Sequence, residues 1–452
     1  MENKPSNLLY GVDDLPPWKI FWLLSVLHVI AMSGTLVLAV VLVTEIGGTA
    51  RQIEVTVAMT MIAAGFGTML QAIRWKGIGS GYLCPSLPAP NFFAATIGAA
   101  WLGGLPLMRG MIIAAGLTEI VFAKFFHRLE FLFPNEITGL VVFMVGFGLI
   151  PIGTAHFFGI NYEGDPIQDI SLIVSALTLF IMAGVSVWGS ANFKLYGVLI
   201  GMIVGYGLCL ATGLLSAADF SAVGNAAWIG LPLYEGMWEI SFSWSLLPVF
   251  IIVSICGALK SFGNLTLCQK FNSAGPVQID MRRAGDGLTA DGLTVVASGL
   301  LGGFAASSSS TNVAITGATG VTSRWIGLAA GGLFILLGFS PKLSAVLSVM
   351  PAPVSGALLL LVICHLMLSG LQIILSTSVD TPKLFVIGIA LAFGISLSTM
   401  PELYAGVFPW LLPLFDSSLT FATVVAVVLN QVLRMHRKKM PTGDIVKGDP
   451  KI

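Results

Sequence analysis

The stretch FAASSSSTNVAITGATGVTSRW, residues 304–325, decides how this chain must be built. Four consecutive serines, followed by Thr311 and Asn312, stand between long apolar runs. An unbroken helix needs about 20 apolar residues to cross a bilayer, so this polar segment interrupts a span. The backbone N–H and C=O groups of a broken span are tolerated at membrane depth only where protein or a water-filled cavity satisfies them. The segment therefore predicts an irregular stretch that lines a site inside the membrane.

Composition places the whole chain in a membrane. Of its 452 residues, 56% are hydrophobic and 10% are charged, whereas soluble domains carry about 25% charged residues. We count about fourteen apolar segments that are long enough to cross, which predicts an all-α polytopic membrane protein. The predicted spans begin near Lys19, Glu54, Gly77, Pro106, Ile137, Ser171, Lys194, Ser245, Gly287, Ser307, Arg324, Pro351, Lys383 and Tyr404.

The basic residues predict the orientation of these spans. With the tail in the cytoplasm, fourteen spans put eighteen of the 22 Lys and Arg residues on the cytoplasmic side. Arg51, Arg109 and Lys342 then fall outside, and Lys260 falls within a span. Because cytoplasmic loops carry an excess of Lys and Arg, this distribution favours two cytoplasmic termini. We expect a multi-pass protein of a bacterial inner (plasma) membrane.

Several other classes of site are not indicated. The five cysteines lie almost wholly in apolar stretches, and neither CxxC nor HExxH occurs, so we predict no disulfide and no metal site. The basic tail MHRKKM suits a cytoplasmic anchor, and no other basic block points to nucleic acid. The Ser run lacks a G-x-S-x-G frame, and paired catalytic carboxylates are not evident, so we expect neither an enzyme nor a cofactor.

A second interrupted segment, GSGYLCPSLPAPN at residues 79–91, carries three prolines. It lies about half a chain length before the serine run, which indicates an inverted repeat with paired broken helices. We expect a short strand at Tyr82–Cys84, an extended Ser307–Ser310, and a half-helix from Asn312 capped by Thr311. Two half-helix N-termini would then face each other across a pocket. The alternative is that small residues merely let the helices pack closely.

The chain also resembles a known family, the nucleobase/ascorbate transporters or nucleobase:cation symporter-2 proteins. The lead YGVDDLPPW followed by LHVIAMSG, with His28, is similar to that family's first-span motif, usually written Gln-His. LTADGLTVVASGLLGG (288–303) resembles its ninth-span entry, and TNVAITGATGVTSR (311–324) resembles its signature Q/E-N-x-G-x(4)-T-x(3)-S-R. The resemblance spans nearly the whole chain and marks it as a xanthine/uracil permease-like, atypical member.

The resemblance implies about 14 spans in a 7+7 inverted repeat, with short strands in the broken spans 3 and 10. Spans 1–4 and 8–11 would form a core domain that holds the substrate, and the remaining spans a gate domain. Many members are homodimers that move a purine or pyrimidine base, or ascorbate, with H+ or Na+. The implied segments are a cytoplasmic lead (1–18), core halves (19–130 and 245–350), gate halves (131–218 and 351–433), an extracellular connector (219–244) and a cytoplasmic tail (434–452).

The sequence departs from the family pattern at the residues that bind the base in other members. Members carry an acid in the eighth span and a polar residue four positions later, where this chain has Lys260 and Asn264. The Gln or Glu of the tenth span is matched by Thr311, and the signature Gly by Ala314. Asn312, together with Thr319, Ser323 and Arg324, does match.

Lys260 admits two interpretations. Cys256, Lys260 and Asn264 form one polar stripe at helical spacing, and an ionisable residue inside a membrane is a functional hypothesis by default. Lys260 can form a structural ion pair with Glu119 or Asp291. It can instead lie in the pocket and favour an anionic or electron-rich substrate, which would leave uniport, exchange or proton loading by the lysine itself as coupling modes.

We therefore predict a secondary transporter for a purine or pyrimidine base or a related small organic anion, such as xanthine or urate. It would work by alternating access of the core domain against the gate domain. The alternative is a carboxylate or inorganic anion exchanger or uniporter on the same fold. The predicted substrate-binding residues are Lys260, Asn264, Thr311, Asn312, Tyr82, Leu83 and Cys84, and the supporting or coupling residues are His28, Glu119, Asp291, Thr319 and Arg324.

Overall fold

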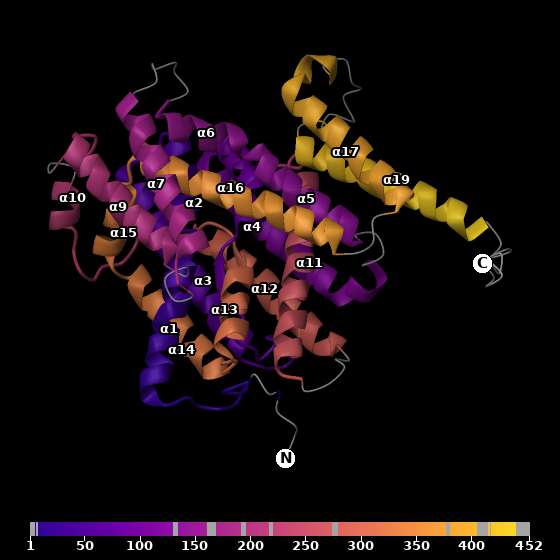
Figure 1. The fold of residues 1–452 in the computed structure, drawn as a ribbon, viewed down its shortest axis with the longest axis horizontal. Coiled ribbons are helices and arrows are strands. Elements are labelled where there is room, and N and C mark those ends of the chain that lie inside the picture. The colour runs from indigo at the N-terminus through magenta and orange to yellow at the C-terminus, as the bar shows by residue number, and fades with distance from the viewer. Residues whose placement is uncertain are drawn as a thin grey trace, which may run out of the picture.

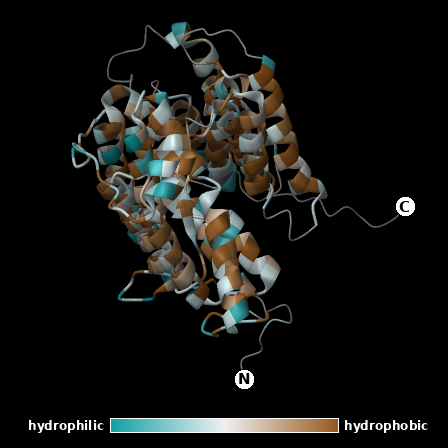
Figure 2. Cartoon of the chain, turned by 90° about the vertical axis from the view of Figure 1, so that its left-hand side faces the viewer, coloured by the Kyte–Doolittle hydropathy of each residue, from teal (hydrophilic) through white to brown (hydrophobic). Residues whose placement is uncertain are grey.

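Helices, most of them apolar, make up the greater part of the computed structural model of the protein (Figure 1). The structure describes residues 5, 8–129, 134–160, 169–190, 196–216, 220–273, 279–376, 380–404, 415 and 417–439. Residues 161–168 and the residues after 439 are among those that lie outside this range. Hydrophobic residues run along the outer helices, as a chain embedded in lipid requires (Figure 2).

The first half of the chain supplies the helices α1 (Trp18–Ser33), α2 (Val37–Glu45), α3 (Ala50–Ala72), α4 (Phe93–Leu129), α5 (Asn135–Gly148), α6 (Ile150–Phe158), α7 (Asp169–Trp188), α9 (Gly197–Thr212) and α10 (Phe220–Asn225). The second half supplies α11 (Leu247–Phe271), α12 (Met281–Leu301), α13 (Ser310–Thr319), α14 (Arg324–Gly338), α15 (Pro341–Ser348), α16 (Ala352–Leu375), α17 (Thr381–Thr399) and α19 (Ser418–Lys439). Short 3-10 turns occupy Pro90–Phe92 (η1) and Pro401–Tyr404 (η3).

Many of these helices can cross a bilayer. Within the described residues, eight helical stretches are long and apolar enough, and a ninth is obtained by joining α14 to α15 across a 75° bend. The apolar helices α9 and α19 are shorter. The chain is thus a multi-pass membrane protein, while the count of fourteen spans stays a prediction. The last span is predicted to start at about Tyr404; residues 405–414 and 416 lie outside the described residues, and α19 begins at Ser418.

The two interrupted segments lie against each other. Strand β1 (Ser86–Pro88) pairs antiparallel with strand β2 (Ala306–Ser308), and Leu87 lies opposite Ser307. The prediction of a strand at Tyr82–Cys84 is wrong in position, because the strand forms four residues later, within the proline-rich part. The prediction that Thr311 caps the half-helix is also wrong. Ser309 is the cap residue, and α13 begins at Ser310.

A break inside α4 separates two predicted spans. Gly103 and Gly104 have non-helical backbone angles, and Gly104 has φ 66° and ψ −166°. L-residues rarely adopt this conformation, so glycine is required there. The break lies just before Pro106, where the fourth span is predicted to begin.

Three pairs of glycines bring helices from the two halves of the chain into backbone contact. Gly65 of α3 faces Gly331 of α14, and an added Cβ on either would lie 2.6 Å from the carbonyl oxygen of the other. The same arrangement joins α4 to α12 through Gly116 and Gly292, and α5 to α16 through Gly139 and Gly370. Small residues let membrane helices approach this closely, so these contacts fix how the halves pack.

A connector between the halves is held by three basic residues. Arg51 of α3 donates hydrogen bonds to the carbonyl oxygens of Leu231 and Leu233. Arg109 of α4 donates to those of Met237 and Glu239, and also to Gly299 and Leu300 at the end of α12. The ammonium of Lys342, in α15, lies 3.4 Å from the carbonyl oxygen of Gly224 and 4.6 Å from the ring centre of Trp228.

The Gly65–Gly331 contact generates a matched test. Gly331→Ala places a methyl group against backbone that cannot move freely, and we expect a loss of about 1–3 kcal/mol in stability. Gly332→Ala, in the same helix, meets no heavy atom within 4 Å and is the control. Thermal unfolding of the purified protein in detergent measures both. Equal unfolding temperatures for the two variants would contradict the close contact.

Candidate functional site

A polar cluster surrounds the place where β1 and β2 pair, which we call the crossing. Asp291 of α12 is fully buried and accepts hydrogen bonds from Ser307 Oγ at 2.8 Å and from the Ser308 backbone N–H at 2.9 Å. It also accepts one from the hydroxyl of Ser261 in α11. The carboxylate thus satisfies a backbone donor that a continuous helix would have satisfied itself.

The serines of the run make different hydrogen bonds. Asn264 of α11 donates to Ser308 Oγ at 2.9 Å and accepts from Ser310 Oγ at 2.9 Å, so one amide joins β2 to the start of α13. Ser309 Oγ accepts from the backbone N–H of Asn312 at 3.1 Å, which caps α13, and from Asn312 Nδ2 at 3.0 Å. Four adjacent hydroxyl groups are needed because the segment leaves one helix and enters another within a few residues.

His28 extends this cluster to α1. Its Nδ1 lies 2.7 Å from Asn312 Oδ1, and both side chains are buried. The Asn312 amide is therefore held at both ends, by His28 and by Ser309. His28 thus contacts one of the predicted substrate-binding residues, and its supporting role stays a prediction.

Lys260 reaches the same crossing from α11. Its Nζ lies 3.4 Å from Asn91 Oδ1 in η1, and the carboxyl groups of Asp291 and Glu119 are its acidic neighbours. Asn91 rests on Gly257 of α11, where an added Cβ would lie 3.2 Å from Asn91 Nδ2. Lys260 is thus half-buried, and its ammonium group is directed at a polar side chain of η1.

Three buried polar groups at this crossing have unused hydrogen-bonding capacity. Ser86 Oγ, Asn91 Nδ2 and both carboxyl oxygens of Glu119 lack a hydrogen-bond partner within the part of the chain that the structure describes. Buried polar groups are normally satisfied, and exceptions that gather in one place indicate a role beyond packing. A small polar ligand with its own donors and acceptors could supply the missing partners.

The predicted substrate-binding residues of the first interrupted segment are less available to a ligand. Tyr82 is buried, and the guanidinium of Arg283 lies 3.7 Å from its ring centre, so one face of the ring is already covered. Leu83 and Cys84 are also buried, and the carbonyl oxygen of Leu83 accepts from Cys268 Sγ at 3.7 Å. These contacts give the three residues a packing role next to the crossing.

The remaining predicted residues fall into two groups. Thr311 is exposed in the first turn of α13, next to the cluster. Thr319 lies at the other end of α13, about 15 Å along the axis. Arg324 begins α14 and lies 2.9 Å from Asp13 Oδ1, so it binds the N-terminal lead. The structure does not bring Thr319 and Arg324 to the crossing.

Further contacts show what the end of the serine-containing stretch does. Thr322 donates its backbone N–H to the Tyr10 carbonyl, and Ser323 Oγ donates to the Asp14 carbonyl at 2.6 Å. The residues TSR therefore hold the lead in place. The sequence offered a signal for this, because three hydrogen-bonding side chains precede a helix start, but it did not reveal the partner.

Sequence reasoning missed Asn91, Ser261 and the individual roles of the serines. Asn91 directly follows the last proline of the first interrupted segment, at the position where a half-helix begins, and this was an available signal. Ser261 stands beside Lys260 in the chain but faces Asp291 and Ser308. No group of three or more His, Cys, Asp or Glu side chains that could hold a metal ion occurs in the described ranges.

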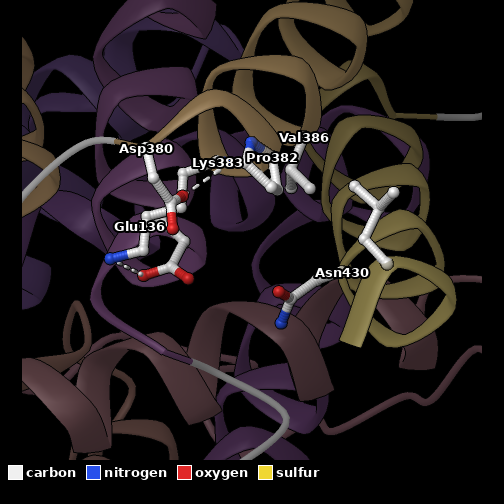
Figure 3. A pocket seen from close by; sticks show the side chains of 7 residues that line it. Glu136, Asp380, Pro382, Lys383, Val386 and Asn430 are labelled. Atoms are coloured by element: carbon white, nitrogen blue, oxygen red, sulfur yellow. Dashed lines mark hydrogen bonds and ion pairs between the residues drawn. The ribbon is translucent and has the colours of Figure 1, made fainter. Parts of the chain in front are cut away.

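A separate cavity opens between α5, α17 and α19 (Figure 3). Its lining includes Glu136, whose carboxylate lies 3.9 Å from the ammonium of Lys383. Its other lining residues are Asp380, Pro382, Val386, Asn430 and Leu433. None of the predicted site residues lines it, so this cavity is distinct from the crossing.

Comparison with known proteins gives a family and a fold. Residues 20–403 match the model of the Permease family, Xan_ur_permease. Xanthine permease XanP of Escherichia coli is 25% identical over 450 residues, covering 95% of this chain and 96% of XanP. Uric acid permease PucJ of Bacillus subtilis is 28% identical over 440 residues, covering 94% and 95%. The transmembrane domain of the cyanobacterial bicarbonate transporter BicA has a similar fold, with TM-score 0.57, 11% identity and coverage of 93% of this chain and 98% of BicA.

The Ser309 cap can be tested against a serine that makes no such bond. Ser309→Ala removes the acceptor for Asn312, and we expect about 1 kcal/mol lower stability and weaker ligand binding as the Asn312 amide loses its support. Ser340→Ala is the control, because Ser340 precedes α15 without a side-chain cap bond. Thermal unfolding with and without ligand compares them. Indistinguishable behaviour would show that the cap does not position Asn312.

Proposed function

The chain belongs to the Permease family, and from this premise we propose that it transports a purine nucleobase such as xanthine or uric acid. As a family member it is a multi-pass membrane permease. The similar proteins XanP and PucJ are named for xanthine and uric acid, which supports the choice of substrate class. Both are planar bases with several donors and acceptors around the ring.

One observation carries the proposed binding site. Unsatisfied buried groups, Ser86 Oγ, Asn91 Nδ2 and the Glu119 carboxyl, gather around the paired strands β1 and β2. Lys260 adds a charged donor at the same place. We place the base there, against Lys260 and Asn91, with Thr311 at the start of α13 next to it. Asn264, Asn312, His28 and Asp291 hold the surrounding backbone, and Tyr82, Leu83 and Cys84 pack behind it.

The packing supports a 7+7 inverted repeat. We take α3, α4, α12 and α14 as spans 2, 4, 9 and 11. A 7+7 repeat relates span 2 to span 9 and span 4 to span 11. The α4–α12 contact therefore corresponds to the α14–α3 contact. Both contacts are made through facing glycines. The strands β1 and β2, in spans 3 and 10, and the α5–α16 pair, in spans 5 and 12, are each exchanged with themselves.

The repeat leads to a core of residues 19–130 and 245–350 that moves against a gate of residues 131–218 and 351–433. A direct contact joins the two units: His156 Nε2 of α6 lies 2.5 Å from Glu45 Oε1 of α2. Ser355 of α16 lies 3.0 Å from the other ring nitrogen of His156. This contact must open or slide when the core moves, so it favours the conformation seen here.

Lys260 favours a second candidate, an exchanger or uniporter of carboxylates or inorganic anions. A cation in the site attracts anions, and the fold is shared with a bicarbonate transporter. The negative charge of Asp291 acts on Lys260, however, and reduces the net positive charge available to a ligand. A nucleobase therefore remains the first choice.

Ligand screening tests the function. The purified protein is heated in detergent with xanthine, uric acid, uracil, ascorbate, bicarbonate or a dicarboxylate, and uptake of the same compounds is measured in liposomes. We expect xanthine or uric acid to raise the unfolding temperature and to be taken up. A response to bicarbonate or dicarboxylate alone would overturn the nucleobase assignment in favour of the anion transporter.

Replacement of Lys260 tests its position in the site. Lys260→Gln removes a charged hydrogen-bond donor, and we expect roughly ten- to hundred-fold weaker xanthine binding. Lys270→Gln is the control, because Lys270 is exposed at the end of the same helix. Isothermal titration of the purified variants gives the dissociation constants. Unchanged xanthine affinity in the Lys260 variant would assign this residue to a structural ion pair.

A further inference from the structure

Glu119 is fully buried in α4, and neither of its carboxyl oxygens has a hydrogen-bond partner within the described residues. An ionised carboxylate in such a place is very costly, because neither water nor a donor stabilises its charge. Even an ion pair needs further hydrogen bonds to offset the loss of water. The environment of Glu119 therefore fits the protonated, uncharged form.

Asp291, its neighbour, has the opposite environment. The hydroxyl groups of Ser261 and Ser307 and the backbone N–H of Ser308 all donate to it. Donors of this kind stabilise a carboxylate, and two adjacent carboxyl groups do not readily ionise together. The distribution of donors therefore assigns the negative charge to Asp291 and a proton to Glu119.

The charge of Lys260 completes the balance. Asp291 from α12 and Lys260 from α11 are the charged groups that act on Glu119. With Glu119 protonated, the ammonium and the Asp291 carboxylate compensate each other. Ionisation of Glu119 would leave one uncompensated negative charge in a buried site. Release of the proton thus requires a conformation in which water reaches the crossing.

The acids of the other helices packed against α4 are engaged elsewhere. Glu45 of α2 contacts His156, and Glu136 of α5 lies 3.9 Å from Lys383. The 3-10 turn η1 contains no charged residue. Glu119 is therefore the acid at this crossing that combines complete burial with unused oxygens.

We infer that Glu119 binds the proton that is transported together with the substrate. One proton from water on one side binds a Glu119 carboxyl oxygen while the site is open to that side. The substrate and the proton are then enclosed together, and the proton returns to water when the site opens to the other side. The inference rests on the proposed function and adds the residue that carries the coupling proton.

Transport in liposomes tests the inference. The wild-type protein, Glu119→Gln and Thr118→Val are reconstituted, and accumulation of radiolabelled xanthine is measured with and without a pH gradient, acidic outside, at zero membrane potential. One proton per uncharged substrate predicts about tenfold accumulation per pH unit for wild type. The Glu119→Gln variant should show an accumulation ratio near one. Thr118→Val, on the neighbouring residue of α4, should behave like wild type.

Two results would overturn the inference: gradient-driven accumulation by Glu119→Gln, or xanthine transport by wild type that a sodium gradient drives and a pH gradient does not. Infrared spectroscopy gives a second measurement that does not depend on the variant's transport activity. At neutral pH, wild type should show a band of a buried protonated carboxyl group that shifts in D2O. Its absence from wild type would contradict a proton on Glu119, whereas a normal band without binding of any nucleobase would contradict only the proposed substrate.

Discussion

The structure depends on one constraint: backbone groups released by two broken helices must find partners at membrane depth. The paired strands β1 and β2 satisfy part of this need with each other. Side chains satisfy more of it, since Asp291 receives the N–H of Ser308 and Thr68 Oγ1 receives the N–H of Ser86. The polar groups that the broken helices require are thus also the groups that are available to the proposed site.

The same constraint determines where charges can lie. The Asp291 carboxylate on α12 tolerates burial because three donors reach it, and the half-buried ammonium group of Lys260 on α11 contacts Asn91. Within the described residues Glu119 lacks such donors, which is why we infer that it is protonated. Glycines at the helix contacts hold α3, α4, α12 and α14 close enough for these side chains to share one space. The arrangement makes the charge state of the crossing sensitive to its opening, because water changes the cost of every group in it.

The sequence was informative where composition contrasts with its surroundings. A serine run and a proline cluster among apolar segments were enough to predict two interruptions, and charged residues within spans pointed to Lys260, Glu119 and Asp291. Positions within the irregular segments were not readable, because the partners of Ser309 and Ser86 depend on tertiary contacts. The strand therefore lies at Ser86–Pro88 and not at Tyr82–Cys84, and Asn91 gained its significance only from Lys260 in space. Arg324 matches the family motif, but its side chain forms an ion pair with Asp13 in the N-terminal lead.

The connector between the halves has a bearing on how the chain is assembled during synthesis. Arg51 and Arg109 belong to helices made before the connector, and Lys342 belongs to one made after it. Arg51 and Arg109 can donate hydrogen bonds to the connector's carbonyl groups as soon as the connector is synthesised. Lys342 can do so only after the second half has been made. The connector can thus serve as a template that keeps the early half in register until the late half docks. Arg51, Arg109 and Lys342, which the distribution of basic residues predicts to lie outside, are the residues that this order of events uses.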